Sequence, residues 1–226
     1  MATQGSGETG QRWAVLLAAG EGKRVRKLTS GPDGVEVPKQ FYAWGGAESM
    51  LQWTLKRSAA VAPPERTVAV VAKQHETWWS RQLAGLPGEN VVVQPRNRGT
   101  GAGILFPVVE ILRRDPDARV AVMPTDHHVE HEPRLQAAIA AAFEAVEDDL
   151  RKVVLVGIEP RQWENGYGWI VPSGPSGGIQ RVDTFVDKPD KTRGKDLMQA
   201  GALMNSFIFV GTAAAIYRMV DDTVPE

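Results

Sequence analysis

Short runs of almost entirely apolar residues alternate with longer amphipathic stretches up to about residue 158. Runs such as WAVLLAA and ARVAVMP have the length of fully buried strands, whereas ESMLQWTLKRSAAVA repeats its apolar positions with the spacing of a helix. This alternation favours an α/β fold with a mostly parallel central sheet covered by helices on both faces. The expected strands are 13–19, 66–72, 90–95, 118–124 and 152–158, and the expected helices are 48–62, 75–83, 101–113 and 132–150.

The pattern changes after Gly157. The runs YGWIVPS, GGIQRVDTFVDKP and NSFIFVG are shorter strands separated by glycine-rich turns, which is typical of hairpins. They predict a small β-rich lid over the sheet, so that the core takes up about 13–158 and the lid with its return strands 159–226. We expect the first twelve residues to be a disordered lead-in, because they contain no apolar segment, and 13–226 to form one domain.

Composition narrows the class of protein. The chain has 226 residues and a net charge of −1, so no overall field attracts it to nucleic acid or to an acidic membrane, and we expect neither as a partner. It contains no cysteine, which excludes disulfides and thiol catalysis and fits a cytoplasmic protein. No apolar run approaches the roughly 20 residues that span a bilayer. Anion binding must therefore come from local basic patches.

One such patch follows the first expected strand. In LLAAGEGKRVRKLT, a glycine turn leads directly into the basic residues Lys23, Arg24, Arg26 and Lys27. Gly20 and Gly22 allow the backbone to approach a phosphate closely, and Arg24 can hold that phosphate from the side. The segment is neither a P-loop nor a complete dinucleotide-binding fingerprint. A plain turn with a solvated basic face is the alternative.

Ligands of open α/β sheets bind beyond the carboxyl ends of the strands, so polar residues there are candidates. Lys39, which follows a proline in VPKQF, is one candidate; the alternative is that it is an ordinary surface lysine. Gln94 ends the third expected strand, where an amide can read the edge of a base. The segment RGTG opens a helix whose positive N-terminus suits phosphate; it can equally be a turn with Thr100 as the N-cap.

Acidic and lid residues complete the candidates. Asp126 comes just after the fourth expected strand, and Mg²⁺ takes one or two carboxylates together with substrate phosphates. His127 and His128 do not predict a zinc site, because neither has a partner at helical spacing. In the lid, ENGYGWI gives a polyhydroxylated ligand access to the backbone, and charged or amide side chains come from FVDKP and MNSFIF.

Taken in order, LAAGEGKR, PKQF, QPRNRGT, PTDH, GYGWI, FVDKP and NSFIF resemble the sugar-nucleotide pyrophosphorylases, and most closely their mannose-1-phosphate guanylyltransferase branch. The resemblance covers about 13–210. It implies a Rossmann-like three-layer sandwich with a sugar-binding lid. It also implies Mg²⁺-assisted transfer of GMP from GTP to mannose 1-phosphate or a related sugar 1-phosphate, giving a GDP-sugar and pyrophosphate. Self-association into a homo-oligomer is left open.

The resemblance also implies a role for each matching residue. The catalytic residues would be Arg24, Lys39 and Lys188, and Asp126 would hold Mg²⁺. The nucleotide would be bound by Ala18, Ala19, Gly20, Gly22, Lys23, Arg24, Gln94, Gly99 and Thr100. The sugar phosphate would be bound by Gly168, Asp187, Lys188 and Asn205.

The chain departs from the family pattern at three points. The usual E-K-P of the lid is D-K-P here, and Met204 stands where tryptophan usually precedes N-S. A second metal-binding aspartate, expected well after NSFIF, has no match, so we expect a chain shortened at its C-terminal end. Three alternatives stay open: thymidylyl or uridylyl transfer to another sugar phosphate, a cytidylyltransferase, and a regulatory homologue that binds sugar nucleotides without turnover. The cytidylyltransferases typically carry H-D-A-A-R-P where this chain has PTDH.

Overall fold

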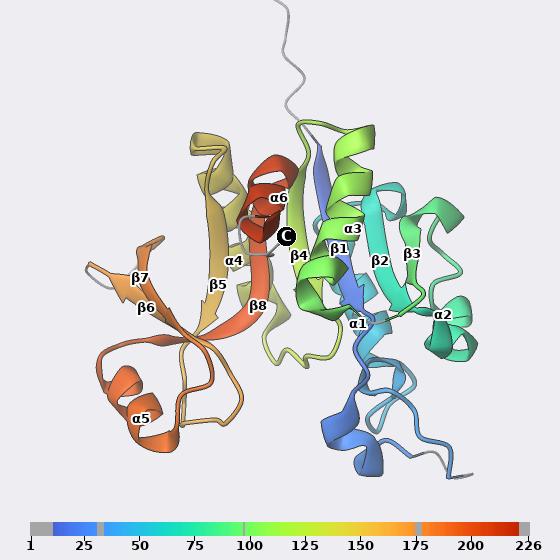
Figure 1. Cartoon of the computed structure of the whole chain (residues 1–226), viewed down its shortest axis with the longest axis horizontal. Helices are drawn as coiled ribbons and strands as arrows, with labels where there is room; N and C mark the ends of the chain where they lie inside the picture. The colour runs from blue at the N-terminus through green and yellow to red at the C-terminus, as the bar shows by residue number, and fades with distance from the viewer. Residues whose placement is uncertain (1–10, 31–33, 97, 175–177, 222–226) are drawn as a thin grey trace, which may run out of the picture.

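The computed structural model describes residues 11–30, 34–96, 98–174 and 178–221, without the side chains of Lys23, Arg24, Arg26 and Asp221. Its centre is a sheet in which four parallel strands lie in the order β3-β2-β1-β4 (Figure 1). Beyond β4 the sheet continues with β8, which is antiparallel to both β4 and β5. The strands are β1 (Arg12–Ala18), β2 (Thr67–Ala72), β3 (Val91–Gln94), β4 (Arg119–Pro124), β5 (Val153–Ile158) and β8 (Leu203–Thr212). The predicted mostly parallel α/β sheet is confirmed.

Helices cover both faces of this sheet because successive residues of a strand point to opposite sides. Leu16 of β1 belongs to one apolar cluster with residues of α1 and α4, whereas Val15 belongs to a second cluster with residues of α3 and α6. Two apolar interfaces on one sheet give the three layers that the sequence predicted. The helices are α1 (Met50–Ser58), α2 (Glu76–Gln82), α3 (Gly99–Arg114), α4 (Glu132–Asp148), α5 (Lys191–Gln199) and α6 (Ala213–Asp221).

Short 3₁₀ helices fill several connections near the strand ends. The most important for the site are η1 and η2, which follow β1. They are η1 (Lys23–Leu28), η2 (Lys39–Phe41), η3 (Pro64–Arg66), η4 (Lys73–His75) and η5 (Gly88–Asn90).

Helix boundaries differ from the predicted ones where capping decides them. Helix α1 begins only after Ser49, because Ser49 Oγ accepts a hydrogen bond from Gln52 N while Gln52 Oε1 accepts one from Ser49 N. Helix α3 begins at Gly99, with Arg98 in the N-cap position, so Thr100 is not the N-cap. The sequence pattern did not predict α5. Asp190 caps this helix by accepting a hydrogen bond from Arg193 N.

Beyond β5 the chain forms a smaller layer beside the sheet. Strands β6 (Trp169–Ser173) and β7 (Arg181–Val186) make an antiparallel hairpin, and β6 joins the main sheet by pairing Trp169 with Met204 of β8. Trp169, Leu197 and Ala202 form a third apolar cluster, which holds α5 to this hairpin. Figure 1 shows the hairpin and α5 gathered beside the lower end of β8. No helix among the described residues is long and apolar enough to cross a membrane.

Candidate active site

A cleft of about 940 Å³ opens at the carboxyl ends of the parallel strands and extends to the β6–β7 hairpin. One wall is built by the loops after β1, β3 and β4, and the other by the hairpin and the start of β8. The residues that the sequence singled out and that line the cleft are Ala19, Gly20, Gly22, Lys39, Gln94, Gly99, Thr100, Asp126, Gly168, Asp187, Lys188 and Asn205. The predicted roles of the Lys23 and Arg24 side chains fall outside the described part of the structure.

The loop after β1 is held by a buried amide. Gln40, which is 3% exposed, donates hydrogen bonds from Nε2 to the carbonyl oxygens of Ala18 (2.9 Å) and Gly20 (2.7 Å). Gly22 has a φ of +61°, and a Cβ on it would lie 2.9 Å from the backbone nitrogen of Lys39. The turn is therefore packed against η2 in a conformation that only glycine adopts without strain. Ala18 is buried at the end of β1, beneath this turn.

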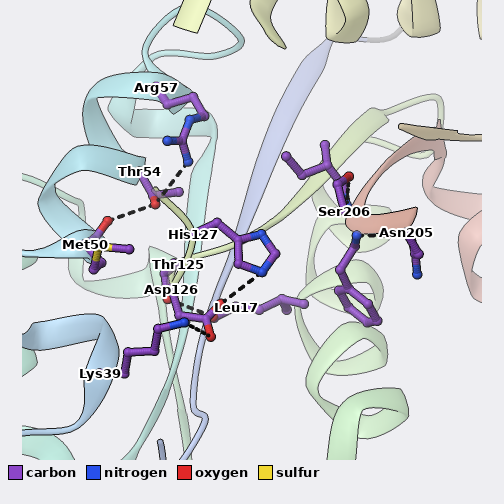
Figure 2. A network of polar contacts seen from close by, with 12 residues as sticks. Leu17, Lys39, Met50, Thr54, Arg57, Thr125, Asp126, His127, Asn205 and Ser206 are labelled. Atoms are coloured by element: carbon purple, nitrogen blue, oxygen red, sulfur yellow. Dashed lines mark hydrogen bonds and ion pairs between the residues drawn. The ribbon is translucent and has the colours of Figure 1, made fainter. Parts of the chain in front are cut away.

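Lys39 and Asp126 meet although they are far apart in sequence. Their strands, β1 and β4, are neighbours, so the loops after them share one edge of the sheet. Lys39 Nζ lies 3.3 Å from Asp126 Oδ2, and both side chains are partly exposed in the cleft (Figure 2). The buried Thr125 fixes the start of the acidic loop, because its Oγ1 donates to the carbonyl oxygen of Leu17 at 2.8 Å.

His127 stands next to this pair. Its Nε2 lies 3.5 Å from Asp126 Oδ1. Burial lowers the pKa of His127 below its ordinary value of 6.5; Asp126 opposes this shift, and the positive charges of Lys39 and Arg57 add to it. A lowered pKa favours the uncharged imidazole, and Lys39 is the cation that pairs with the aspartate.

The donor set around Asp126 fits a hard divalent cation that is shared with a substrate. In the described part of the chain, no three acidic or histidine side chains converge to form a metal cage. Asp126 is 43% exposed on the cleft side and offers one carboxylate, which is the protein contribution that Mg²⁺ takes when phosphates supply further ligands. The residues therefore suit Mg²⁺ brought together with a polyphosphate.

Gln94 and the first turn of α3 form the deep end of the cleft. Gln94 is 2% exposed, and its Nε2 has no hydrogen-bond partner among the described residues. An unsatisfied buried donor is costly unless a ligand or water completes it. Gly103 of α3 leaves room beside this amide, since a Cβ there would lie 3.6 Å from Nε2. The arrangement provides a hydrogen-bond donor for an acceptor atom in the cleft.

The opposite wall brings the lid residues together. Lys188 has a φ of +42°, and its Nζ pairs with Asp187 Oδ2 at 2.9 Å. Asn205 N donates to the carbonyl oxygen of Gly168 at 2.8 Å, which joins β8 to the start of β6. Gly168 lies against the ring of Phe185, where a Cβ would come within 2.4 Å of Cζ. These contacts set a cation and an amide across the cleft from Lys39.

A comparison with protein-family models identifies the family of this chain. The model described as "Nucleotidyl transferase" matches residues 13–218. The chain belongs to the nucleotidyl transferase family. Among curated relatives, the alginate biosynthesis protein AlgA of Pseudomonas syringae pv. tomato is 31% identical over 206 residues, covering 88% of this chain and 41% of the relative. Mannose-1-phosphate guanylyltransferase of Escherichia coli K12 is 32% identical over 187 residues, covering 79% and 38%.

Solved structures extend the comparison to the fold of this chain. The crystal structure of mannose-1-phosphate geranyltransferase from Thermus thermophilus superposes with a TM-score of 0.80 at 26% identity, covering 94% of this chain and 64% of that one. Apo UDP-glucose pyrophosphorylase, at 16% identity and a TM-score of 0.65, shares the fold. The chain spans about two fifths of the length of the curated relatives that it matches.

Several residues of the cleft were not predicted. Gln40 and Thr125 act on backbone carbonyl groups, and their only sequence signal is a polar residue next to a candidate, in PKQF and PTDH. Tyr167, Phe185 and Phe207 also line the cleft. Tyr167 lies in the segment ENGYGWI, which was singled out for its backbone, whereas Phe185 and Phe207 lie in strand-like runs where aromatic residues are expected in the core.

Proposed function

We propose that this nucleotidyl transferase moves a nucleotidyl group from a nucleoside triphosphate to a sugar 1-phosphate, and that GTP and mannose 1-phosphate are its substrates. The observation that carries the proposal is the placement of Lys39 with Asp126 on one wall of a single cleft and of Lys188 with Asn205 on the other. Two walls, each with a cation, suit two anionic substrates that must react with each other.

The chemistry needs charge neutralisation more than a base. A phosphate oxygen of the sugar 1-phosphate attacks the α-phosphorus of the triphosphate, and the bond from that phosphorus to the β-bridging oxygen breaks, releasing pyrophosphate. The nucleophile is already an anion, so no side chain has to remove a proton. Mg²⁺ held by Asp126 and the phosphates would supply positive charge at the reacting oxygens. Lys39 and Arg24 neutralise the negative charge of the leaving phosphates.

The remaining residues orient the two substrates. The Gly20–Gly22 turn offers backbone N–H groups to the triphosphate, and Lys188 neutralises the sugar phosphate. Gln94 Nε2 donates to a carbonyl oxygen of the base, which guanine presents at O6 and adenine replaces with an amino group. The lean to guanine and mannose is supported by the names of relatives such as mannose-1-phosphate guanylyltransferase of Escherichia coli K12.

Pyrophosphate release tests the proposal directly. The four nucleoside triphosphates are each combined with mannose 1-phosphate, glucose 1-phosphate and galactose 1-phosphate in the presence of Mg²⁺, and released pyrophosphate is measured. We expect release to be fastest with GTP and mannose 1-phosphate and to stop with EDTA. Nucleotide binding without pyrophosphate release from any pair would overturn the proposal and favour a regulatory homologue.

A further inference from the structure

Strand β8 leaves its regular pairing with β5 where it forms the wall of the cleft. Val156 of β5 pairs with Ile208, but the next residue, Gly157, pairs with Asn205. Ser206 and Phe207 therefore have no partner residue on β5, and β8 bulges there. Phe207 takes a φ of +61° in this bulge, a left-handed conformation that is costly for a residue with a side chain. Bulges next to a site re-aim side chains.

The hydroxyl of Ser206 holds the bulge in place. Ser206 is 3% exposed, and its Oγ donates to the carbonyl oxygen of Val156 at 2.6 Å (Figure 2). Ser206 Oγ also accepts a hydrogen bond from Ile208 N at 3.0 Å. One side chain thus bonds both a backbone acceptor of β5 and a backbone donor of β8 at the point where β8 departs from β5.

The bulge in turn fixes the side chain of Asn205. Asn205 Oδ1 accepts a hydrogen bond from Phe207 N at 3.0 Å, while Asn205 N donates to the carbonyl oxygen of Gly168. With Oδ1 engaged, the amide offers Nδ2, which has no partner among the described residues, as a donor in the cleft that Asn205 and Phe207 line. A neutral amide donor suits a sugar hydroxyl or a phosphate oxygen.

We propose that Ser206 is a positioning residue for the sugar 1-phosphate, acting through the bulge on the amide of Asn205. The inference rests on the function proposed above, which supplies the substrate class. Without the Ser206 hydroxyl, the left-handed conformation of Phe207 loses its support, and the Asn205 amide loses its fixed orientation. Binding of the sugar 1-phosphate suffers, whereas the nucleotide end of the cleft, around Gln94, is unaffected.

Steady-state kinetics of Ser206→Ala test this inference. We expect the KM for the sugar 1-phosphate to rise about 5- to 10-fold, the size of one misplaced hydrogen bond, with the KM for the nucleotide and kcat within about 2-fold of wild type. Ser206→Cys retains a weak donor and acceptor, so its KM should be intermediate. It also provides the comparison if the alanine variant does not fold.

Thr212 on the same strand is the matched control. Its Oγ1 donates to the carbonyl oxygen of Leu150 and accepts from Ala215 N, both at 3.0 Å, and the residue is 8% exposed. Thr212 thus makes the same pair of backbone contacts as Ser206 at the opposite end of β8. Thr212→Val should lower the melting temperature as Ser206→Ala does, without any change in KM.

A double-mutant cycle separates positioning from a general structural role. If Ser206 acts through Asn205, then Ser206→Ala adds nothing to the KM rise of Asn205→Ala. Additive rises, or an unchanged KM in Ser206→Ala with a melting temperature as low as that of Thr212→Val, would overturn the inference alone. Absence of pyrophosphate release by the wild-type protein with every sugar 1-phosphate would instead remove the proposed function, and this inference with it.

Discussion

A single missing Cβ shapes the turn that is expected to receive the triphosphate. We expect Gly22→Ala to reduce the free energy of unfolding by about 1–2 kcal/mol, because φ at this position is +61° and the new Cβ would lie 2.9 Å from the Lys39 backbone nitrogen. Gly20→Ala is the matched control, since its Cβ meets no atom within 4 Å and its φ is not left-handed. Urea unfolding measures both. Equal free energies of unfolding in the two variants would contradict the strain argument.

Charge at the reacting phosphates should dominate turnover. Asp126→Ala and Arg24→Ala should each lower kcat at least ~100-fold, the order of an electrostatic transition-state contact, and leave the melting temperature nearly unchanged. Glu130→Ala, in the same loop as Asp126 but with a side chain 67% exposed, should retain full activity. Pyrophosphate release is the readout. A normal rate in the Asp126 variant would rule out its part in holding the metal.

Residues that follow strands were predictable as candidates, whereas residues that support them were not. Lys39 and Asp126 could be expected at one edge of the sheet because strands that alternate with helices end on the same side. Gln40 could not, since its bonds to the carbonyl oxygens of Ala18 and Gly20 depend on how η2 packs beneath β1. The left-handed conformations of Lys188 and Phe207 likewise leave no sequence signal, because neither residue type favours a positive φ.

At the scale of elements, one ion pair joins α1 to the start of α4. Arg57, which is 3% exposed, donates from Nε to Glu132 Oε2 at 2.9 Å and from Nη2 to Oε1 at 2.6 Å. Its Nη1 also reaches Thr54 Oγ1 at 3.4 Å (Figure 2). A carboxylate in the first turn of a helix is favoured by the helix dipole. The pair fixes where α4 begins and hence the loop that carries Asp126.

Breaking this pair should destabilise the fold, because the buried charge of Arg57 is left without its partner. Glu132→Ala leaves the Arg57 guanidinium without its carboxylate, so we expect a loss of about 3 kcal/mol in the free energy of unfolding. Combining it with Arg57→Leu should recover much of that loss, since no unpaired charge remains. Arg113→Ala, at an ion pair whose arginine is 76% exposed, is the control and should cost less than about 1 kcal/mol. A loss in Glu132→Ala no larger than in this control would contradict the argument.

Strands and helices were predicted correctly where most of their residues are buried, and were missed where few are. Strands β2 and β4 are buried at every position, so their apolar runs identify them without ambiguity. Helix α5 has the sequence KTRGKDLMQ and buries only Gly194 and Leu197, which leaves too few apolar positions for a periodic signal. The predicted helix 48–62 was too long at its C-terminal end, because the chain turns before Pro63 and Pro64, which cannot continue a helix.

At the scale of the whole molecule, the reversed direction of β8 brings the two halves of the site together. Because β8 runs antiparallel to β4, its first residues lie at the edge where β4 ends, so Asn205 reaches the same cleft as Asp126. An apolar run predicts a strand but not its direction. The parallel core was therefore predictable from its alternation with helices, whereas this insertion of β8 between β4 and β5 was not.

Two halves of the chain line the cleft, so a bound ligand should stabilise the whole fold. Nucleotide at 100 times its Kd adds about 2.7 kcal/mol, or roughly 5–10 °C in melting temperature for a domain of this size. We expect GTP with Mg²⁺ to produce this shift and ATP at the same concentration a smaller one, because Gln94 Nε2, which has no partner among the described residues, can meet a carbonyl oxygen in guanine but an amino group in adenine. Gln94→Met keeps the side-chain length without the donor and should reduce the GTP shift to that of ATP. Equal shifts with GTP and ATP in the wild-type protein would show that this amide does not select the base.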